Sequence, residues 1–238
     1  MTPSESNIVL SADSLSKVYG EGTLRVEALK PTTFTAHTGE VVAILGPSGS
    51  GKSTLLTILG LINPPTTGSL RIGQTKVIEK GRAVANLDQQ RRQQIGFVFQ
   101  RSNLIPFLSA EENVRLALEL DDVPPAQSRA RSRTMLEGLG LGKRLHALPS
   151  RLSGGEAQRV AIARALIHKP AVVLADEPTA SLDSHRGRQV MELFREAARS
   201  QGAAVLVVTH DHRTLDLVDR ILDMEDGVLS EKAVAAPG

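Results

Sequence analysis

A glycine-rich segment early in the chain has the residue types needed to hold a polyphosphate. It follows the pattern G-x-x-x-x-G-K-[ST] without a gap and reads Gly46-Pro47-Ser48-Gly49-Ser50-Gly51-Lys52-Ser53. An apolar run at 41–45 precedes it and a helical pattern follows, so we expect a buried strand, a turn and a helix start. The glycines free backbone N–H groups, and the positive end of the helix adds to their attraction for phosphate.

Three side chains of this segment extend the phosphate chemistry. We expect Lys52 to reach the β- and γ-phosphates, and the Ser53 hydroxyl to ligate Mg²⁺. Thr54 is a further candidate phosphate contact. The alternative, a glycine-rich turn in an ordinary strand–helix unit, is disfavoured because both flanking elements are predicted.

Two adjacent acids, Asp176 and Glu177, follow the wholly apolar strand pattern at 171–175. Ligands of open α/β sheets bind at this edge, where one carboxylate can hold Mg²⁺ and the other can deprotonate an attacking water. A helix cap and a surface charge are an equal alternative when the pair is considered alone. Together with the upstream phosphate segment, the pair favours hydrolysis of a nucleotide.

Three further polar residues have two interpretations each. Gln100 and His210 end apolar strand patterns, where each either contacts phosphate, metal or water or merely begins a loop. Tyr19, the single tyrosine of a chain without tryptophan, either stacks on adenine or is a half-buried strand residue. The run His210-Asp211-His212 is too short a pattern to predict a metal site.

A second set of small residues, Ser153-Gly154-Gly155, precedes a helical pattern and predicts another anion-binding helix start. An ordinary capped helix start is the alternative. This set is remote in sequence from the phosphate segment at 46–53, so one chain carries two incomplete halves of a site. The arrangement suggests that two copies complete each other.

The patterns that must position these groups predict an α/β fold. Strand patterns at 8–10, 15–20, 26–29 and 33–36, the last two separated by Pro31, predict an antiparallel sheet. After the strand at 95–99, about seventy residues lack strand patterns, and helices are expected at 113–120, 128–139 and 158–168. Ser109 and Glu112 predict a capping box that opens the first of these helices. We therefore predict one domain, 1–238, with an all-helical insertion at approximately 101–160.

Composition excludes several classes of protein. Lys and Arg number 28 against 26 Asp and Glu, and this excess of +2 is too small to predict nucleic-acid binding. With no cysteine, the chain has no disulfide, thiolate metal site or cysteine nucleophile. Residues 1–6 lack a signal-peptide pattern and the apolar runs are too short to span a membrane, so we expect that the chain does not cross a membrane by itself. The lack of cysteine is compatible with a cytoplasmic location.

In this order, the motifs resemble those of ATP-binding-cassette ATPases along nearly the whole chain. The resemblance raises Tyr19 to an adenine-stacking residue, Gln100 to the Q-loop, Glu177 to the general base and His210 to the switch histidine. The segment motifs are Walker A at Gly46–Ser53, the signature at Leu152–Glu156, Walker B at Val172–Asp176 and the D-loop at Ser181-Leu182-Asp183. A small departure is Glu156, where glutamine is common, and we expect activity to survive it.

The resemblance implies a P-loop NTPase core (RecA-like) with an N-terminal antiparallel β subdomain and an inserted helical subdomain. It also implies a head-to-tail homodimer that clamps two ATP molecules, with Mg²⁺, between Walker A of one copy and Ser153-Gly154-Gly155 of the other. Asp183 adds to the ligand set, and Ser53, Gln100 and Asp176 hold the metal. A transmembrane permease is the implied partner, which places the chain peripherally on the inner face of the cell membrane.

A finer resemblance is to the lipoprotein-release and macrolide-efflux branch, with features of glycolipid-export relatives. It rests on segments 95–100, 103–106, 112–114, 174–179, 208–213 and 219–221. A periplasmic adaptor, reached through the permease, is a further partner in this branch. Two alternatives remain: a mechanical regulatory ATPase of the cell-division type, and a cassette ATPase acting on nucleic acid or ribosomes. The second is disfavoured by the absence of a second cassette, a long coiled-coil insertion and a basic tract.

Overall fold

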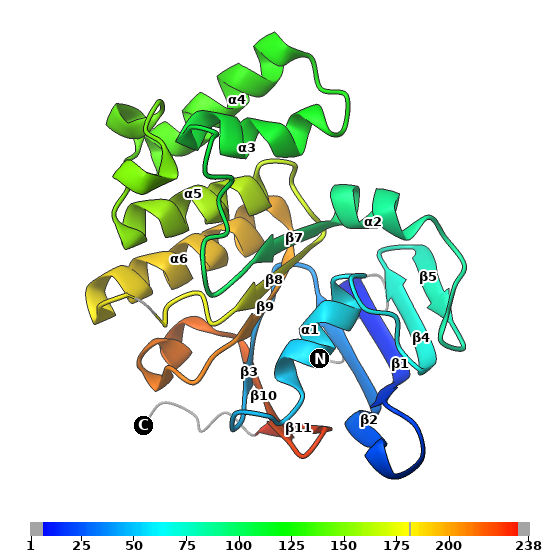
Figure 1. The fold of residues 1–238 in the computed structure, drawn as a ribbon. Coiled ribbons are helices and arrows are strands. Elements are labelled where there is room, and N and C mark those ends of the chain that lie inside the picture. The colour runs from blue at the N-terminus through cyan, green and yellow to red at the C-terminus, as the bar shows by residue number, and fades with distance from the viewer. Residues whose placement is uncertain (1–6, 181, 233–238) are drawn as a thin grey trace.

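The computed structural model describes residues 7–180 and 182–232, and its largest sheet has six strands (Figure 1). Their order is β11-β10-β3-β9-β8-β7, and all neighbours are parallel except the β10–β11 hairpin. The strands are β3 (Val41–Leu45), β7 (Ile95–Val98), β8 (Val172–Asp176), β9 (Ala204–Val208), β10 (Arg220–Glu225) and β11 (Val228–Lys232). Ser181 of the predicted D-loop and the tail at 233–238 lie outside the described residues.

A second, antiparallel sheet has the order β2-β1-β4-β5-β6. Its strands are β1 (Ile8–Tyr19), β2 (Val26–His37), β4 (Thr67–Ile72), β5 (Thr75–Glu79) and β6 (Arg82–Ala83). The predicted break at Pro31 is wrong, because β2 runs through it as one strand. β2 lies at the edge of this sheet and its register with β1 shifts near this proline, so the missing N–H is tolerated.

Three apolar clusters hold the layers together. The helix α1 (Lys52–Leu59) packs between the two sheets, and its leucines share one cluster with residues of both. On the opposite face of the six-stranded sheet, α6 (Ser184–Gln201) packs against side chains of β3, β8 and β9. A third cluster joins the helices that Figure 1 shows stacked above α6. Alternate residues of the central strands enter the first two clusters, as expected for a sheet buried on both faces.

The helices of the third cluster lie between β7 and β8 in the chain. α2 (Leu87–Gln94) precedes β7, and α3 (Ala110–Glu119), α4 (Pro125–Gly138) and α5 (Gly154–Leu166) follow it. The predicted capping box of Ser109 and Glu112 is confirmed. α4 starts at Pro125, earlier than predicted, because proline fits the first helical position, and α5 starts directly after Ser153. Short 3-10 helices occur at η2 (Gly22–Leu24), η3 (Gly142–Arg144), η4 (Pro149–Arg151) and η5 (His212–Leu217).

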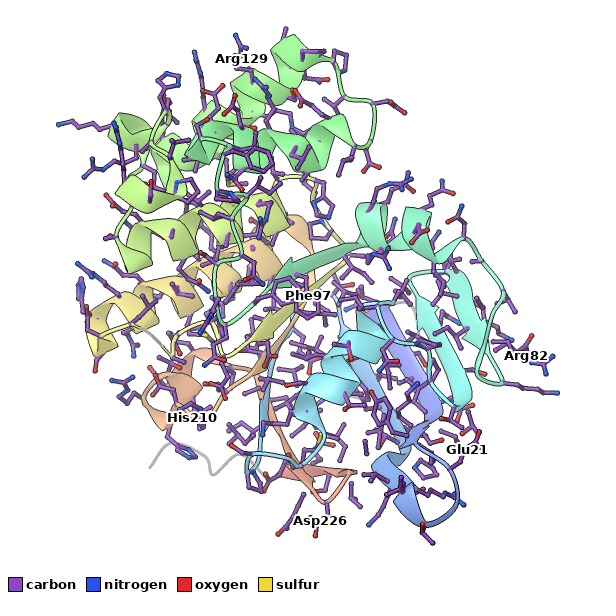
Figure 2. All side chains as sticks on the ribbon, in the orientation of Figure 1. Glu21, Arg82, Phe97, Arg129, His210 and Asp226 are labelled. Carbon is purple, nitrogen blue, oxygen red and sulfur yellow. The ribbon has the colours of Figure 1, made fainter. Side chains whose placement is uncertain are left out.

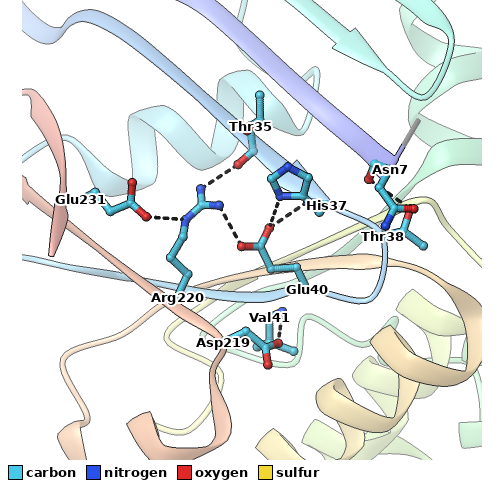
Figure 3. A network of polar contacts seen from close by, with 9 residues as sticks. All are labelled: Asn7, Thr35, His37, Thr38, Glu40, Val41, Asp219, Arg220 and Glu231. Atoms are coloured by element: carbon cyan, nitrogen blue, oxygen red, sulfur yellow. Dashed lines mark hydrogen bonds and ion pairs between the residues drawn. The ribbon is translucent and has the colours of Figure 1, made fainter. Parts of the chain in front are cut away.

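A network of polar contacts joins the two sheets (Figure 3). Glu40, just before β3, accepts hydrogen bonds from the backbone N–H of His37 and from Nη1 of Arg220, both at 2.8 Å. Arg220 also donates to the carbonyl of Thr35 in β2, at 2.7 Å. Because β2 and β10 belong to different sheets, these bonds fix the two sheets relative to each other at the start of β3. They therefore help to position the phosphate segment, which follows β3. Within the described residues, no helix has both the length and the apolar composition of a membrane span.

Candidate active site

A cleft of about 450 Å³ lies at the carboxyl ends of the central parallel strands and gathers most of the predicted groups. Its lining includes Ser48, Gly49, Gly51, Lys52, Ser53, Thr54, Gln100, Asp176, Glu177 and His210. β3, β7, β8 and β9 are parallel neighbours, so the residues that follow them converge at one edge of the sheet. A larger groove of about 610 Å³ between α4 and α6 contains none of these groups.

The backbone of the phosphate segment adopts conformations that favour glycine. Gly46 and Gly51 have φ of 140° and 104°, and a Cβ there would lie 2.0 Å from the Met224 carbonyl oxygen and 2.3 Å from that of Ala28. Gly49 has φ of 83°, but a Cβ there would meet no atom within 4 Å and would extend into open space. Because Gly49 lines the cleft, the space beside its Cα leaves room for a ligand that approaches the backbone closely.

The start of α1 supplies donors for an anion. Its N-cap is Gly51, which has no side chain to accept from the first N–H groups of the helix. Such an uncapped start attracts phosphate. The Lys52 ammonium donates to the carbonyl oxygens of Gly46 and Pro47, at 2.8 and 2.6 Å, so it lies along the same segment. The charge and the free N–H groups fit a polyphosphate chain.

Asp176 and Ser53 form the part of the cleft that suits a divalent cation. The Ser53 hydroxyl donates to Oδ2 of Asp176 at 3.3 Å. Burial raises the pKa of the Asp176 carboxyl, and the bond from Ser53 opposes that rise. A partly desolvated carboxylate beside a hydroxyl, with Gln100 in the same cleft, is an oxygen-rich donor set of the kind that Mg²⁺ prefers.

Glu177 and His210 face each other across the same edge of the sheet. Nδ1 of His210 lies 2.8 Å from Oε1 of Glu177, whose Oε2 is buried and has no hydrogen-bond partner among the described residues. Glu177 has φ of 47°, a left-handed conformation that is uncommon for a residue with a side chain. Only 16% of the Glu177 side chain is exposed against 72% for His210, which lies at the surface beside η5 in Figure 2. The free carboxylate oxygen is suited to accept a proton from water.

The remaining predicted residues do not line this cleft. Ser153 and Gly154 are exposed at the start of α5, Gly155 is buried behind them, and Asp183 caps α6 by accepting from the Arg186 N–H at 2.9 Å. They belong to the helical side of the molecule. One copy of the chain therefore presents the two glycine-rich helix starts as separate surfaces.

Tyr19 is also outside the cleft, at the end of β1, with 42% of its surface exposed. Its hydroxyl accepts a hydrogen bond from Asn63, and the Lys17 ammonium lies 5.0 Å from the ring centroid. Its role in binding adenine stays a prediction.

Sequence reasoning missed residues that shape the site through their main chain. The carbonyls of Ala28 and Met224 pack against the phosphate segment, and Val208 lines the cleft and accepts from the Glu177 N–H at 2.9 Å. Any side chain that fits the strand could supply these groups, so no sequence pattern marks them. Only the positions of strand ends, once the sheet order is known, could have identified them.

Comparisons with known proteins agree with this geometry. The model of the family described as ABC transporter matches residues 29–180. The lipoprotein-releasing system ATP-binding protein LolD of Shewanella denitrificans is 44% identical, over 97% of this chain and 98% of its own length. The pyoverdine export ATP-binding/permease protein PvdT of Pseudomonas entomophila is also 44% identical, over 94% of this chain and 34% of its own. The dimeric post-hydrolysis structure of the ATP-binding cassette MJ0796, bound to ADP and Pi, has a TM-score of 0.83 and 38% identity, with coverage of 93% and 98%.

Proposed function

This chain belongs to the ABC transporter family, and we propose that it hydrolyses ATP with Mg²⁺ at sites shared between two copies. It is the ATP-hydrolysing subunit of a bacterial transporter and works with a membrane permease. The observation that carries the proposed chemistry is the cleft where the phosphate segment, Asp176, Glu177 and His210 meet.

In the proposed mechanism, Lys52 and the N–H groups at the start of α1 hold the β- and γ-phosphates. Ser53, Gln100 and Asp176 would hold Mg²⁺, which neutralises phosphate charge when bound. Oε2 of Glu177 accepts the proton of the attacking water, since it is buried in the cleft and unpaired in the described structure. His210 orients Glu177 through the bond to Oε1 and is close enough to the cleft to contact the γ-phosphate.

A head-to-tail pair of copies would complete the site. Ser153 and Gly154 are exposed and do not line the cleft of their own chain, so they are available to the phosphates bound by a partner. MJ0796, which shares the fold, has been solved as a dimer with ADP and Pi. We propose the same use of Gly155 and Asp183, and adenine stacking by Tyr19.

We further propose a permease of the lipoprotein-release type on the inner face of the membrane. The names of LolD and PvdT, a lipoprotein-releasing and a pyoverdine-export protein, support export or extraction. Phe107, in the segment between Gln100 and α3, is 78% exposed and is a candidate contact for the permease. Through that permease the complex would reach a periplasmic adaptor, and no nucleic acid is expected.

The test uses the tagged Glu177→Gln variant with ATP and Mg²⁺. We expect it to bind ATP, to turn over at least about a hundredfold more slowly than the unmodified chain, and to double its mass in light scattering. Added to detergent-solubilised host membranes, it should capture a permease with a large extracytoplasmic domain. Lys52→Ala is the matched control, which we expect to lose ATP binding and therefore both the dimer and the capture.

The outcomes separate the alternatives. Rapid turnover by Glu177→Gln would remove the base assignment. Capture of nucleic acid or ribosomes in place of a permease would contradict the transporter function and leave the ATPase chemistry intact. If a permease is captured but no substrate stimulates hydrolysis by the reconstituted complex, the mechanical regulatory function is favoured.

A further inference from the structure

Arg213 links the segment that carries His210 to the first residue of α6. His210 is 72% exposed and its ring contacts Glu177, so its position depends on the residues on either side of it. Thr209 on one side is buried and its N–H donates to the carbonyl of Ile44 in β3, at 3.2 Å. Asp211 on the other side is held by Arg213.

Arg213 and Asp211 form a two-pronged ion pair. Nε of Arg213 lies 2.7 Å from Oδ1 of Asp211, and Nη2 lies 2.7 Å from Oδ2. Oδ1 also accepts from the Arg213 N–H at 3.0 Å, which caps η5. The Asp211 side chain is only 10% exposed, and the pair lowers the pKa of its carboxyl. Such a planar fork restricts orientation more strongly than a single contact does.

The remaining guanidinium nitrogen of Arg213 reaches a different element. Nη1 donates to the hydroxyl of Ser184, the first residue of α6. The residue before it, Asp183, caps that helix and belongs to the predicted D-loop. In the same turn, Cδ of Arg186 would lie 3.4 Å from a Cβ on Gly155, next to the signature segment. One turn of α6 therefore contacts both the His210 segment and the surface proposed to meet a second copy.

An ion pair also joins α6 to η5, one helical turn farther along α6. Arg188, one helical turn after Ser184, bonds Asp216 of η5 with Nη1–Oδ1 at 3.2 Å and Nη2–Oδ2 at 2.7 Å. Arg188 and Arg213 are similarly exposed, at 47% and 54%. Arg213, however, binds the immediate neighbour of His210. The two arginines thus form a matched pair in which only one contacts the residue next to the proposed catalytic group.

We propose that Arg213 is a positioning residue for ATP hydrolysis, which joins Asp211 to Ser184 and so sets His210 relative to the first turn of α6. The proposal rests on the function proposed for His210 above. Because Arg213 contacts both Asp211 and Ser184, a change in the position of Asp183 when a second copy binds would also shift His210 relative to Glu177. Neither Arg213 nor Ser184 lines the cleft, so their effect on hydrolysis is indirect.

The test compares ATP hydrolysis by the full chain and its Arg213→Ala, Ser184→Ala, double and Arg188→Ala variants, with His210→Ala as reference. We expect Arg213→Ala to lower kcat about tenfold with an unchanged KM for ATP, because small displacements of a reacting group cost rate more than binding. Ser184→Ala should lower kcat about threefold. The double variant should match Arg213→Ala, because both changes remove the same hydrogen bond between Arg213 and Ser184.

Arg188→Ala is the control for a merely structural effect. It removes the ion pair between α6 and η5, whose arginine is about as exposed as Arg213, and should keep kcat within about twofold of the unmodified chain. Equal losses in the two arginine variants, an additive double variant, or a normal kcat in Arg213→Ala would each overturn the proposal. Normal hydrolysis by His210→Ala would instead remove the function proposed for His210, and the positioning role with it.

Discussion

The two glycine-rich helix starts of this chain differ in how their first N–H groups are capped. α1 follows Gly51, which offers no side-chain acceptor to the first N–H groups. α5 follows Ser153, whose hydroxyl accepts from the Glu156 N–H while the Glu156 carboxylate accepts from the Ser153 N–H, at 2.8 Å. The first start therefore leaves its donors to a ligand, whereas the second already satisfies part of its own.

The acidic residues near the two helix starts also differ, because folding shifts their pKa values in opposite directions. Burial raises the pKa of Asp176 beside α1, so its ionised form is disfavoured in the described structure. The Ser153 N–H and then the Arg144 side chain lower the pKa of Glu156 at α5. In the cleft, the ionised carboxylate of Asp176 is disfavoured until a cation binds. At the start of α5, the carboxylate of Glu156 is already stabilised by neighbouring groups of the same chain. A binding site can hold a carboxylate whose burial is unfavourable without its ligand, whereas a surface that contacts a second copy does not require this.

The largest expected effect comes from replacing one glycine at each start with alanine. Gly51→Ala places a Cβ 2.3 Å from the Ala28 carbonyl at φ of 104°, and should lower the free energy of unfolding by about 2 kcal/mol or more. Gly154→Ala meets no atom within 4 Å and should change it by less than about 0.5 kcal/mol. Urea unfolding of both variants measures the contrast.

Activity should separate the same two variants a second time. Gly51→Ala should lose ATP binding together with stability, because the phosphate segment itself is distorted. Gly154→Ala should bind ATP normally and yet hydrolyse it slowly, because its Cβ would face the nucleotide of a partner copy. A Gly154→Ala protein with normal hydrolysis would show that α5 does not approach a second ATP site.

The next effect concerns the charge that burial disfavours. Because the pKa of Asp176 is raised on folding, the folded state holds the proton more tightly than the unfolded chain does. The free energy of unfolding should therefore fall as pH rises above the ordinary aspartate pKa of 3.8, and level off above the raised value. Asp176→Asn should remove this fall and raise Tm by about 2 °C at pH 7.

The same substitution should abolish hydrolysis that depends on Mg²⁺, since an amide is a weaker cation ligand than a carboxylate. Thermal unfolding between pH 3.5 and 7, without added metal, measures the stability part. A lower Tm for Asp176→Asn at pH 7 would mean that the ionised carboxylate stabilises the fold, and the contrast with Glu156 would then disappear.

Sequence reasoning reached the features that local chemistry determines. The glycine pattern at 46–53 and the apolar strand before Asp176 each contain their own physical reason, and the capping box at Ser109 is a four-residue pattern. The α/β class followed from strand patterns interrupted by helices, and the known cassette structure confirms it. These features depend on residues that are close together in the chain.

Features that depend on distant neighbours could not be predicted. β2 continues through Pro31 because it lies at a sheet edge, which only the strand order reveals. The left-handed backbone of Glu177 and its bond to His210, 33 residues away, depend on how the ends of β8 and β9 adjoin. Arg213 resembles any exposed arginine in the sequence until the structure places it between Asp211 and Ser184.

The smallest expected effect tests the self-capped start of α5. Glu156→Gln keeps an acceptor for the Ser153 N–H but removes the charge that the helix start and Arg144 stabilise, at 2.9 Å from Nε. The loss at pH 7 should be only about 0.5 kcal/mol, because the ion pair is at the surface. Because folding lowers the pKa of Glu156, its contribution is complete above the ordinary glutamate value of 4.5 and is lost as pH falls through the lowered one.

The Tm of Glu156→Gln should therefore approach that of the unmodified chain in acid and lie below it near neutral pH. Its rate of ATP hydrolysis should equal that of the unmodified chain. A thermal unfolding series from pH 3 to 7, with Glu112→Gln at the matching capping box of α3 as control, measures this difference. If Glu112→Gln shows the same pH profile, the cap alone explains both. A strong loss of hydrolysis in Glu156→Gln alone would mean that this acid contacts the nucleotide of a second copy, and α5 would then resemble α1 as a ligand-binding helix start.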